Sequence, residues 1–415
     1  MHIPNLNQLI LFRHLAEDPL MQQVADLLQA SVARDDQLVS VHYAALMHGL
    51  LEQAEQHGQP LWSGLVLTRL AEEETPFSLR AEGRPQEIEP LLLRSAIHDI
   101  PIIQAWMNLD WRELLTTSGL EAESMYEALI RPSALLPALT VNLASLAEIF
   151  QAGRQPRDAA MLLWQHYAHY SCGPMALYHA FQWNDGGLQG IAEPDPIGLD
   201  ELVGCDDQVR ILCANTDAFL AGKPAQHVLL SGARGTGKSS SIKGLLNQYA
   251  SKGLRMVELR REQLPEYPRL VNLLRSRQLH FIIFVDDLSF ETFEGEYKSL
   301  KSSIEGSLQS PPGNIMLCVS SNLRHLIAQE ELTGRRDPHR SDRQQEQLSF
   351  ASRFGISLSY YTPTPAEYLA IVDHLAKRFD IALAPEELHR QAMQWELNHH
   401  GRSGRSARQF IEQLI

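Results

Sequence analysis

The sequence predicts an α/β protein with a parallel-sheet core, preceded by a mostly α-helical domain and followed by a small C-terminal helical lid. Three observations lead to this prediction. Residues 1–183 carry apolar residues at the three- and four-residue spacing of helices. Short apolar runs then alternate with helical patterns, and the first of these runs leads into a glycine-rich loop. From residue 364 the pattern is helical to the end.

The N-terminal domain is expected to span 1–183, and a linker rich in glycine and proline is expected at 184–198. The parallel-sheet core should occupy 199–362 and the lid 363–415. Apolar periodicity predicts helices at 6–16, 21–33, 40–56, 61–73, 102–115 and 138–152, and strands at 227–231, 254–259, 280–287, 315–321 and 355–360.

The acidic charge of the chain lies in its N-terminal half. The sequence has 36 Lys and Arg against 50 Asp and Glu, a formal net charge of −14. Before residue 200 there are 24 acidic residues, ten arginines and no lysine. Because polyphosphate binding usually needs basic side chains, this half is a poor nucleic-acid-binding surface. We therefore expect it to act as an adaptor for a protein partner.

Composition also predicts where the protein works. The four cysteines form no C-x-x-C pair, which fits a reducing cytoplasm. No apolar stretch approaches the length of a membrane span, and the first residues lack the basic region and cleavage site of a signal peptide. A cytoplasmic protein without membrane attachment is expected.

The glycine-rich loop is the strongest functional signal in the sequence. Residues 232–239 read G-A-R-G-T-G-K-S, which matches G-x-x-x-x-G-K-[ST] at every fixed position. A loop between a strand and a helix directs backbone N–H groups and the helix dipole at a phosphate. Lys238 is expected to reach the β- and γ-phosphates and Ser239 to ligate Mg²⁺. The predicted nucleotide-binding residues of the loop are Gly232, Ala233, Arg234, Gly235, Thr236, Gly237, Lys238, Ser239 and Ser240.

Two carboxylates end a second apolar run. The segment FIIFVDD at 281–287 is typical of a strand buried inside a parallel sheet, and its end should lie at the carboxyl edge, where ligands bind. Asp286 is the predicted Mg²⁺-side carboxylate, and Asp287 is predicted to orient and deprotonate the attacking water. With the loop, these residues predict ATP and Mg²⁺ as cofactors.

From residue 195 to its end the sequence resembles the AAA+ ATPases, which implies a P-loop AAA+ core. The segment LDELVG at 199–204 resembles the one that lines the adenine pocket, which implies contacts from Leu202 and Val203. VSSN at 319–322 resembles sensor 1, in which Asn322 would hold the lytic water or the γ-phosphate. The longer sequence segments around these motifs resemble an uncharacterised bacterial AAA+ family of unknown function. The resemblance implies an ATPase.

Two arginines extend the resemblance. SRFG at 352–355 resembles the arginine-finger motif, which implies that Arg353 faces the next subunit of a homo-oligomer. SGRSARQFI at 403–411 resembles sensor 2, in which Arg405 would reach the γ-phosphate from the lid. Arg402 and Arg408 are alternatives for that role.

The sequence departs from the family pattern at one catalytic position. AAA+ Walker B motifs usually end Asp-Glu, whereas this one ends Asp286-Asp287, with a side chain one methylene shorter. Hydrolysis is therefore expected to be slow, or to be assisted by Glu291 in the segment DLSFE, which would help to position the water. The alternative interpretation is that Glu291 only caps a helix. The choice of base between Asp287 and Glu291 stays open.

Two classes of function follow. The first is an ATPase that remodels or switches a protein partner, and the second is a nucleotide-controlled nucleic-acid module similar to helicase loaders or transposition ATPases. An unfoldase is disfavoured, because 258–270 has no aromatic-hydrophobic-glycine pore loop. Basic residues without interleaved aromatic residues signal nucleic acid only weakly, so a protein partner is favoured. These basic residues are Arg260, Arg261, Lys298, Lys301 and the run at 335–343.

His399 and His400 lack a third ligand nearby, so no metal site is predicted there.

Overall fold

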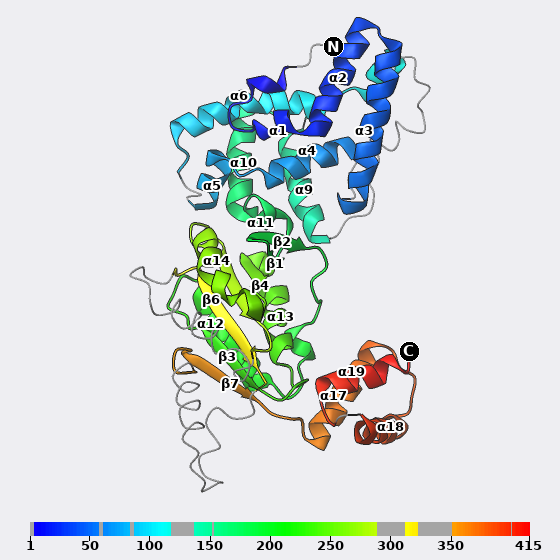
Figure 1. Ribbon diagram of the computed structural model, residues 1–415, viewed down its shortest axis with the longest axis vertical. Helices are drawn as coiled ribbons and strands as arrows, with labels where there is room; N and C mark the ends of the chain where they lie inside the picture. Colours follow the sequence, from blue (N-terminus) through cyan, green and yellow to red (C-terminus); the bar gives the residue numbers. More distant parts are fainter. Residues whose placement is uncertain are drawn as a thin grey trace. The chain divides into compact units, whose positions relative to one another are not determined.

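The computed structural model describes residues 4–57, 61–83, 87–117, 137–151, 153–288, 312–322, 351–399 and 401–415. It divides into two compact units, Met1–Tyr178 and His179–Ile415 (Figure 1). Within these described ranges, no helix combines the length and the apolar character needed to cross a membrane.

The first unit is helical, as predicted, and has one hydrophobic core. Its elements are η1 (Leu6–Gln8), α1 (His14–Glu17), α2 (Pro19–Ala33), α3 (Asp36–His57), α4 (Leu61–Glu72), α5 (Pro76–Gly83), α6 (Pro90–Met107), α7 (Trp111–Thr117), α9 (Pro137–Ile149), α10 (Pro156–Tyr170) and α11 (Pro174–Leu177). Proline begins α2, α6, α10 and α11, where the first N–H has no helical partner to lose. Trp62, Phe77, Trp164 and Tyr167 are fully buried in this core.

Two of the predicted N-terminal helices are interrupted. Over 6–16, η1 and α1 are separated by non-helical backbone, because the buried Asp99 carboxylate accepts hydrogen bonds from the N–H groups of Ile10, Leu11 and Phe12 at 2.7–3.2 Å. A side chain that satisfies three successive N–H groups removes the reason for them to form a helix. Over 102–115, α6 ends before Asn108, whose side chain donates to the Gln104 carbonyl at 2.8 Å.

The second unit is built on a seven-stranded, mostly parallel sheet of order β2-β1-β4-β5-β6-β3-β7. The five predicted strands are present as β3 (Val228–Gly232), β4 (Leu254–Glu258), β5 (His280–Val285), β6 (Ile315–Ser321) and β7 (Ile356–Tyr360). All neighbours among these five are parallel. The predicted α/β class is therefore confirmed.

A hairpin occupies residues that we expected to be a domain end and a linker. β1 (Ala180–Asn184) and β2 (Gly187–Ile191) pair antiparallel, and β1 also pairs in parallel with β4. Asp185 and Gly186 form the turn with φ of 48° and 75°, the backbone that Asp-Gly favours in two-residue hairpins. Part of the predicted linker at 184–198 is thus an edge strand of the sheet.

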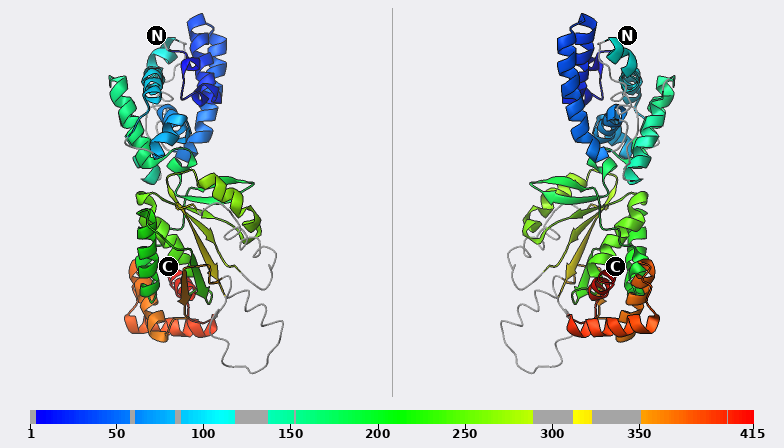
Figure 2. Two further views of the ribbon diagram at one scale, coloured as in Figure 1. Left: turned by 90° about the vertical axis from the view of Figure 1, so that its left-hand side faces the viewer. Right: turned by 90° about the vertical axis from the view of Figure 1, so that its right-hand side faces the viewer.

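Helices lie on both sides of the sheet (Figure 2). α12 (Asp206–Leu220) and α13 (Lys238–Tyr249) share one hydrophobic cluster with side chains from β3 to β7. The remaining elements of this part are η2 (Leu199–Glu201), η3 (Ala250–Lys252), η4 (Arg261–Glu266) and α14 (Tyr267–Leu274). β4, β5 and β6, which follow β3 along the chain, lie on one side of β3 in the sheet, and β7 lies on its other side. Such a point, where the strand order reverses, is where open parallel sheets bind ligands, at the carboxyl ends of the strands.

The chain ends in three helices with their own small core. These are α17 (Pro365–Arg378), α18 (Pro385–Asn398) and α19 (Gly404–Glu412). Tyr368, Ala392 and Ala407, one from each helix, are fully buried together. This is the predicted helical lid region.

Candidate nucleotide-binding site

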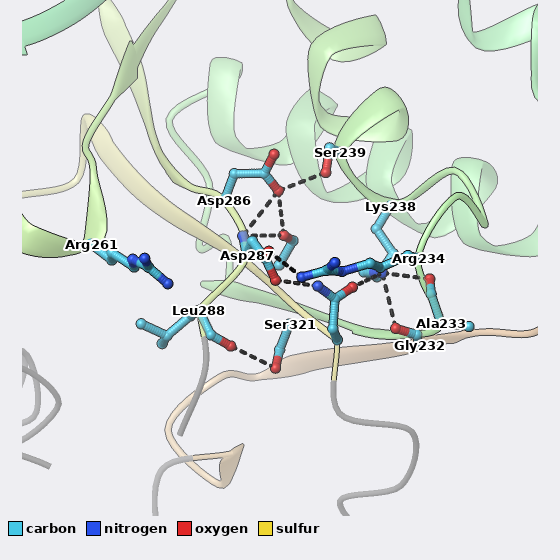
Figure 3. A network of polar contacts seen from close by, with 12 residues as sticks. Gly232, Ala233, Arg234, Lys238, Ser239, Arg261, Asp286, Asp287, Leu288 and Ser321 are labelled. Atoms are coloured by element: carbon cyan, nitrogen blue, oxygen red, sulfur yellow. Dashed lines mark hydrogen bonds and ion pairs between the residues drawn. The ribbon is translucent and has the colours of Figure 1, made fainter. Parts of the chain in front are cut away.

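The register of three neighbouring strands brings the predicted site residues together. Ser231 of β3 is opposite Ser321 of β6, and Val285 of β5 is opposite Val319 of β6. The carboxyl ends of all three strands therefore meet at one edge of the sheet, and the residues that follow them form the network drawn in Figure 3.

Lys238 is the buried cation of this network. It is the first residue of α13, and only 6% of its surface is exposed. Its ammonium group donates to the carbonyls of Gly232 and Ala233 at 2.9 and 2.7 Å and to Oδ1 of Asn322 at 3.0 Å. Burial lowers the pKa of Lys238, while Asp286 and Asp287 act in the opposite direction. The loop thus encloses a positive charge directly beside the N-terminus of α13.

Asp286 gathers two hydroxyl groups. Its Oδ1 accepts hydrogen bonds from Ser239 at 2.6 Å and from Ser320 at 2.5 Å (Figure 3). A serine hydroxyl beside a carboxylate is an all-oxygen donor set, which suits Mg²⁺ because this ion keeps several waters and takes few protein ligands. The two residues predicted to hold Mg²⁺ therefore lie in contact.

Asp287 lies between the loop and β6. Its carboxylate accepts a short hydrogen bond from the amide of Asn322 and forms an ion pair with Arg234 at 3.5 Å. Its φ is +55°, a conformation that Asp tolerates better than most residues. The Asp287 N–H donates to Ser320 Oγ at 2.9 Å and so helps to stabilise that backbone.

Gly232 begins the loop where no side chain fits. Its φ is +148°, and a Cβ atom there would lie 2.1 Å from the carbonyl oxygen of Tyr360 in β7. Gly237, just before α13, has φ of +98°, also in the range that favours glycine. The glycine positions of the motif therefore meet a backbone requirement at both ends of the loop.

The segment predicted to line the adenine pocket lies between two hydrophobic clusters. Leu202 packs with the cluster of the sheet and would be 3.9 Å from a Cβ atom at Gly237, whereas Val203 packs against the cluster of the C-terminal helices. Glu201, next to both, forms an ion pair with Arg378 of α17. This segment thus connects the loop and the lid.

Arg405 is the lid arginine that lies at the loop. If Gly235 carried a Cβ atom, that atom would lie 3.4 Å from the Cβ atom of Arg405, and the Arg405 side chain is exposed. Its two alternatives have acidic neighbours, since Arg402 lies 3.7 Å from Glu396 and Arg408 lies 3.3 Å from Glu412. Arg405 thus lies beside the loop, and each alternative has an acidic partner.

Arg353 is not part of this network. It precedes β7, whose first residue, Ile356, is opposite Val228 at the start of β3. The loop follows the other end of β3. Glu291 and the basic residues at 298, 301 and 335–343 lie outside the described residues.

Ser320 is a site residue that the sequence prediction missed. Its hydroxyl contacts both acidic residues of the site, because it donates to Asp286 and accepts from the N–H of Asp287. A signal was available, since Ser320 and Asn322 are two residues apart and side chains at that spacing share one face of a strand.

Cys205 is a described thiol close to the loop. Burial, reinforced by Asp206 and Glu367, raises the pKa of the Cys205 thiol to about 11, so it is neutral near pH 7 although it lies 3.7 Å from the Thr236 carbonyl. Across the described ranges, no three His, Cys, Asp or Glu residues form a group able to hold a metal.

A parallel sheet with β3 inside it, a glycine-rich loop after β3, an acidic end on β5 and a C-terminal helical bundle are together the arrangement of a P-loop α/β fold. Residues 176–415 match the family described as "Protein of unknown function (DUF815)". Because the match covers more than half of the chain, the protein belongs to this family.

Curated proteins give no match. Among solved structures, the chain is similar to the Thermotoga maritima RuvB Holliday junction branch migration motor, with 19% identity and a TM-score of 0.37 over 52% of this chain and 63% of that chain. A single-substitution variant of RuvB gives the same values, and another gives 17%, 0.34, 52% and 72%. The chain thus spans 63% of the RuvB motor itself, and these scores carry no conclusion about activity.

Proposed function

We propose that this protein binds ATP with Mg²⁺ and hydrolyses it. The observation that carries the proposal is the buried Lys238 beside the N-terminus of α13, with the Ser239 hydroxyl 2.6 Å from the Asp286 carboxylate. A backbone cradle with one enclosed cation suits a polyphosphate, and the hydroxyl–carboxylate pair suits the cation that accompanies it.

Each polar side chain has a proposed role. Lys238 binds the β- and γ-phosphates, Ser239 and Asp286 hold Mg²⁺, and Asp287 with Asn322 orients the attacking water. When bound, Mg²⁺ would neutralise charge that develops on the transferred phosphoryl group. Ser320 holds the Asp286 carboxylate in position, since its hydroxyl donates to it at 2.5 Å. Arg405 is the proposed lid residue that contacts the γ-phosphate.

Replacing Asp287 by asparagine is expected to retain ATP binding and to lower turnover by roughly 10²-fold or more, the effect of losing a general base. The amide keeps the size of the side chain and can still accept the hydrogen bond from Asn322. Steady-state phosphate release, with ATP affinity measured in parallel, tests this expectation.

Two further variants identify the base. Asp286→Asn should weaken binding and Mg²⁺ dependence together, because it alters the cation site. If Glu291→Gln lowers turnover more than Asp287→Asn does, the base is Glu291 and Asp287 only positions water.

We further propose that the active form is a homo-oligomer in the cytoplasm and that its helical N-terminal region binds a protein partner. The acidic charge before residue 200 supports a protein over a nucleic acid. None of the four cysteines, all of them described, forms a disulfide, which agrees with a reducing compartment.

The same charge argument predicts weak nucleic-acid binding. The full-length protein with ATP and Mg²⁺ should fail to shift single- or double-stranded DNA at physiological salt and sub-micromolar protein. Sub-micromolar binding whose affinity falls steeply with salt would instead favour the nucleic-acid-associated module.

A further inference from the structure

The lid contacts the phosphate loop through one backbone hydrogen bond. The N–H of Gly404 donates to the carbonyl oxygen of Gly235 at 2.9 Å. Gly404 is the first residue of α19, after the N-cap residue Ser403, and the first N–H groups of a helix have no partner within the helix. A loop carbonyl therefore satisfies a lid donor that the lid itself cannot satisfy.

The contact is close on the loop side. Gly235 has φ of +74°, and a Cβ atom there would lie 2.9 Å from both Cβ and Oγ of Ser403. The lid can therefore approach this carbonyl only where the loop carries glycine in this backbone conformation. Gly235, which stands at a variable position of the motif, thus meets a packing requirement of the lid as well as the turn requirement of the loop.

The start of α19 is held firmly in the lid. Ser403 Oγ accepts from the N–H of Ser406 at 3.0 Å, and the Ser406 hydroxyl donates to the Gly401 carbonyl at 2.9 Å. Ala407 and Ile411, one and two turns on, are fully buried in the lid core. Because the helix start and the lid core form one packed body, the Gly404 hydrogen bond links that whole body to the loop.

We propose that the Gly404 N–H is a positioning group that sets the lid on the phosphate loop and thereby holds Arg405, the next residue, at the phosphates. The inference rests on the proposed ATP hydrolysis for its effect on rate, and on geometry alone for the contact itself. A nucleotide that changes the direction of the Gly235 carbonyl would change the lid position through this bond.

The test compares Gly404→Pro with Gly404→Ala. Proline removes the N–H, yet it suits the first position of a helix and tolerates the extended φ and ψ of −161° and 160° at Ser403. Alanine keeps the N–H, and its Cβ atom would meet only the Gly235 carbonyl oxygen, at an ordinary 3.5 Å. The Cδ atom of proline takes the direction of the amide hydrogen toward the Gly235 carbonyl, so proline displaces this carbonyl, whereas alanine leaves the contact in place.

One backbone hydrogen bond of ordinary net strength corresponds to roughly a fivefold change in an equilibrium. Gly404→Pro removes this bond and displaces the Gly235 carbonyl, so it should lower kcat about fivefold or more with little change in KM, and it should speed hydrogen exchange of the loop at 233–237 by a similar factor. Gly404→Ala should behave as the wild type in both measurements. Equal kcat and equal loop exchange in the two variants would overturn the proposal.

A measurement on the wild-type protein makes the test independent of both ATP turnover and the proline variant. In the nucleotide-free protein, the Gly404 amide should exchange at least tenfold more slowly than in an unstructured chain, because Gly235 accepts its hydrogen bond. Exchange at the unprotected rate would overturn the contact. Protection of this amide in a protein that does not hydrolyse ATP would keep the contact and reject the proposed function.

Discussion

Replacing Lys238 by alanine should abolish measurable ATP binding, with a loss of affinity of about 10²-fold or more. This side chain is the buried cation of the loop, and its Nζ is bonded to the carbonyls of Gly232 and Ala233 and to Asn322. Hydrogen bonds from an ammonium group to phosphate oxygens are charge-assisted, and no other lysine lies in the loop at 232–239. Calorimetry with ATP and Mg²⁺ measures the change.

Lys243→Ala is the matched control. It removes a lysine from the same helix, but this lysine is exposed and lies 3.4 Å from Asp195, away from the loop carbonyls. The control should bind ATP within about twofold of the wild type, since exposed ion pairs contribute little. If Lys238→Ala, shown to be folded by circular dichroism, retains wild-type affinity, the loop is not the nucleotide site.

The strands of the core were predictable because each is a short, mostly apolar run. All residues of β3 and β6 are buried, so their sequences carry neither an alternating pattern nor a helical one. The hairpin of β1 and β2 was missed for the opposite reason. β2 is a partly exposed edge strand with two glycines, and its Asp-Gly turn, which marks a hairpin, also fits a linker.

The site could be predicted residue by residue, whereas its contacts could not. The motif indicates that Lys238, Asp286 and Asn322 belong to one site, but only the strand order places β6 between β5 and β3. That order makes Ser320 a partner of Asp286 and Asn322 a partner of Lys238. Pairing between distant strands depends on the whole sheet, so local patterns do not contain it.

The first predicted helix shows the same limit within the N-terminal region. Residues 6–16 have helical periodicity, yet Asp99, nearly ninety residues later, takes the N–H groups of Ile10 to Phe12. A buried carboxylate with three backbone donors outweighs a weak local preference for helix. Local propensity at 6–16 is therefore overruled by a tertiary contact.

The position of Arg353 predicts activity shared between subunits. It precedes β7 at the edge of the sheet where β3 begins, while the phosphate loop follows the far end of β3. Five residues of strand span roughly 15 Å, so the length of β3 separates Arg353 from its own phosphate loop. If this arginine acts on ATP, it acts on the ATP of a neighbouring subunit.

Arg353→Ala is therefore expected to bind ATP normally and to lose about 10³-fold in turnover, the contribution of a guanidinium supplied in trans to the transferred phosphoryl group. Wild-type turnover per subunit should rise with protein concentration. Arg210→Ala, which removes an exposed arginine paired with Asp207 on α12, should change neither property.

The decisive experiment mixes Arg353→Ala with Lys238→Ala, each inactive alone. Their shared interface joins an intact loop to an intact arginine, so activity should return on mixing. Absence of recovery in subunits shown by light scattering to co-assemble would exclude the arginine in trans and would favour a monomeric ATP switch.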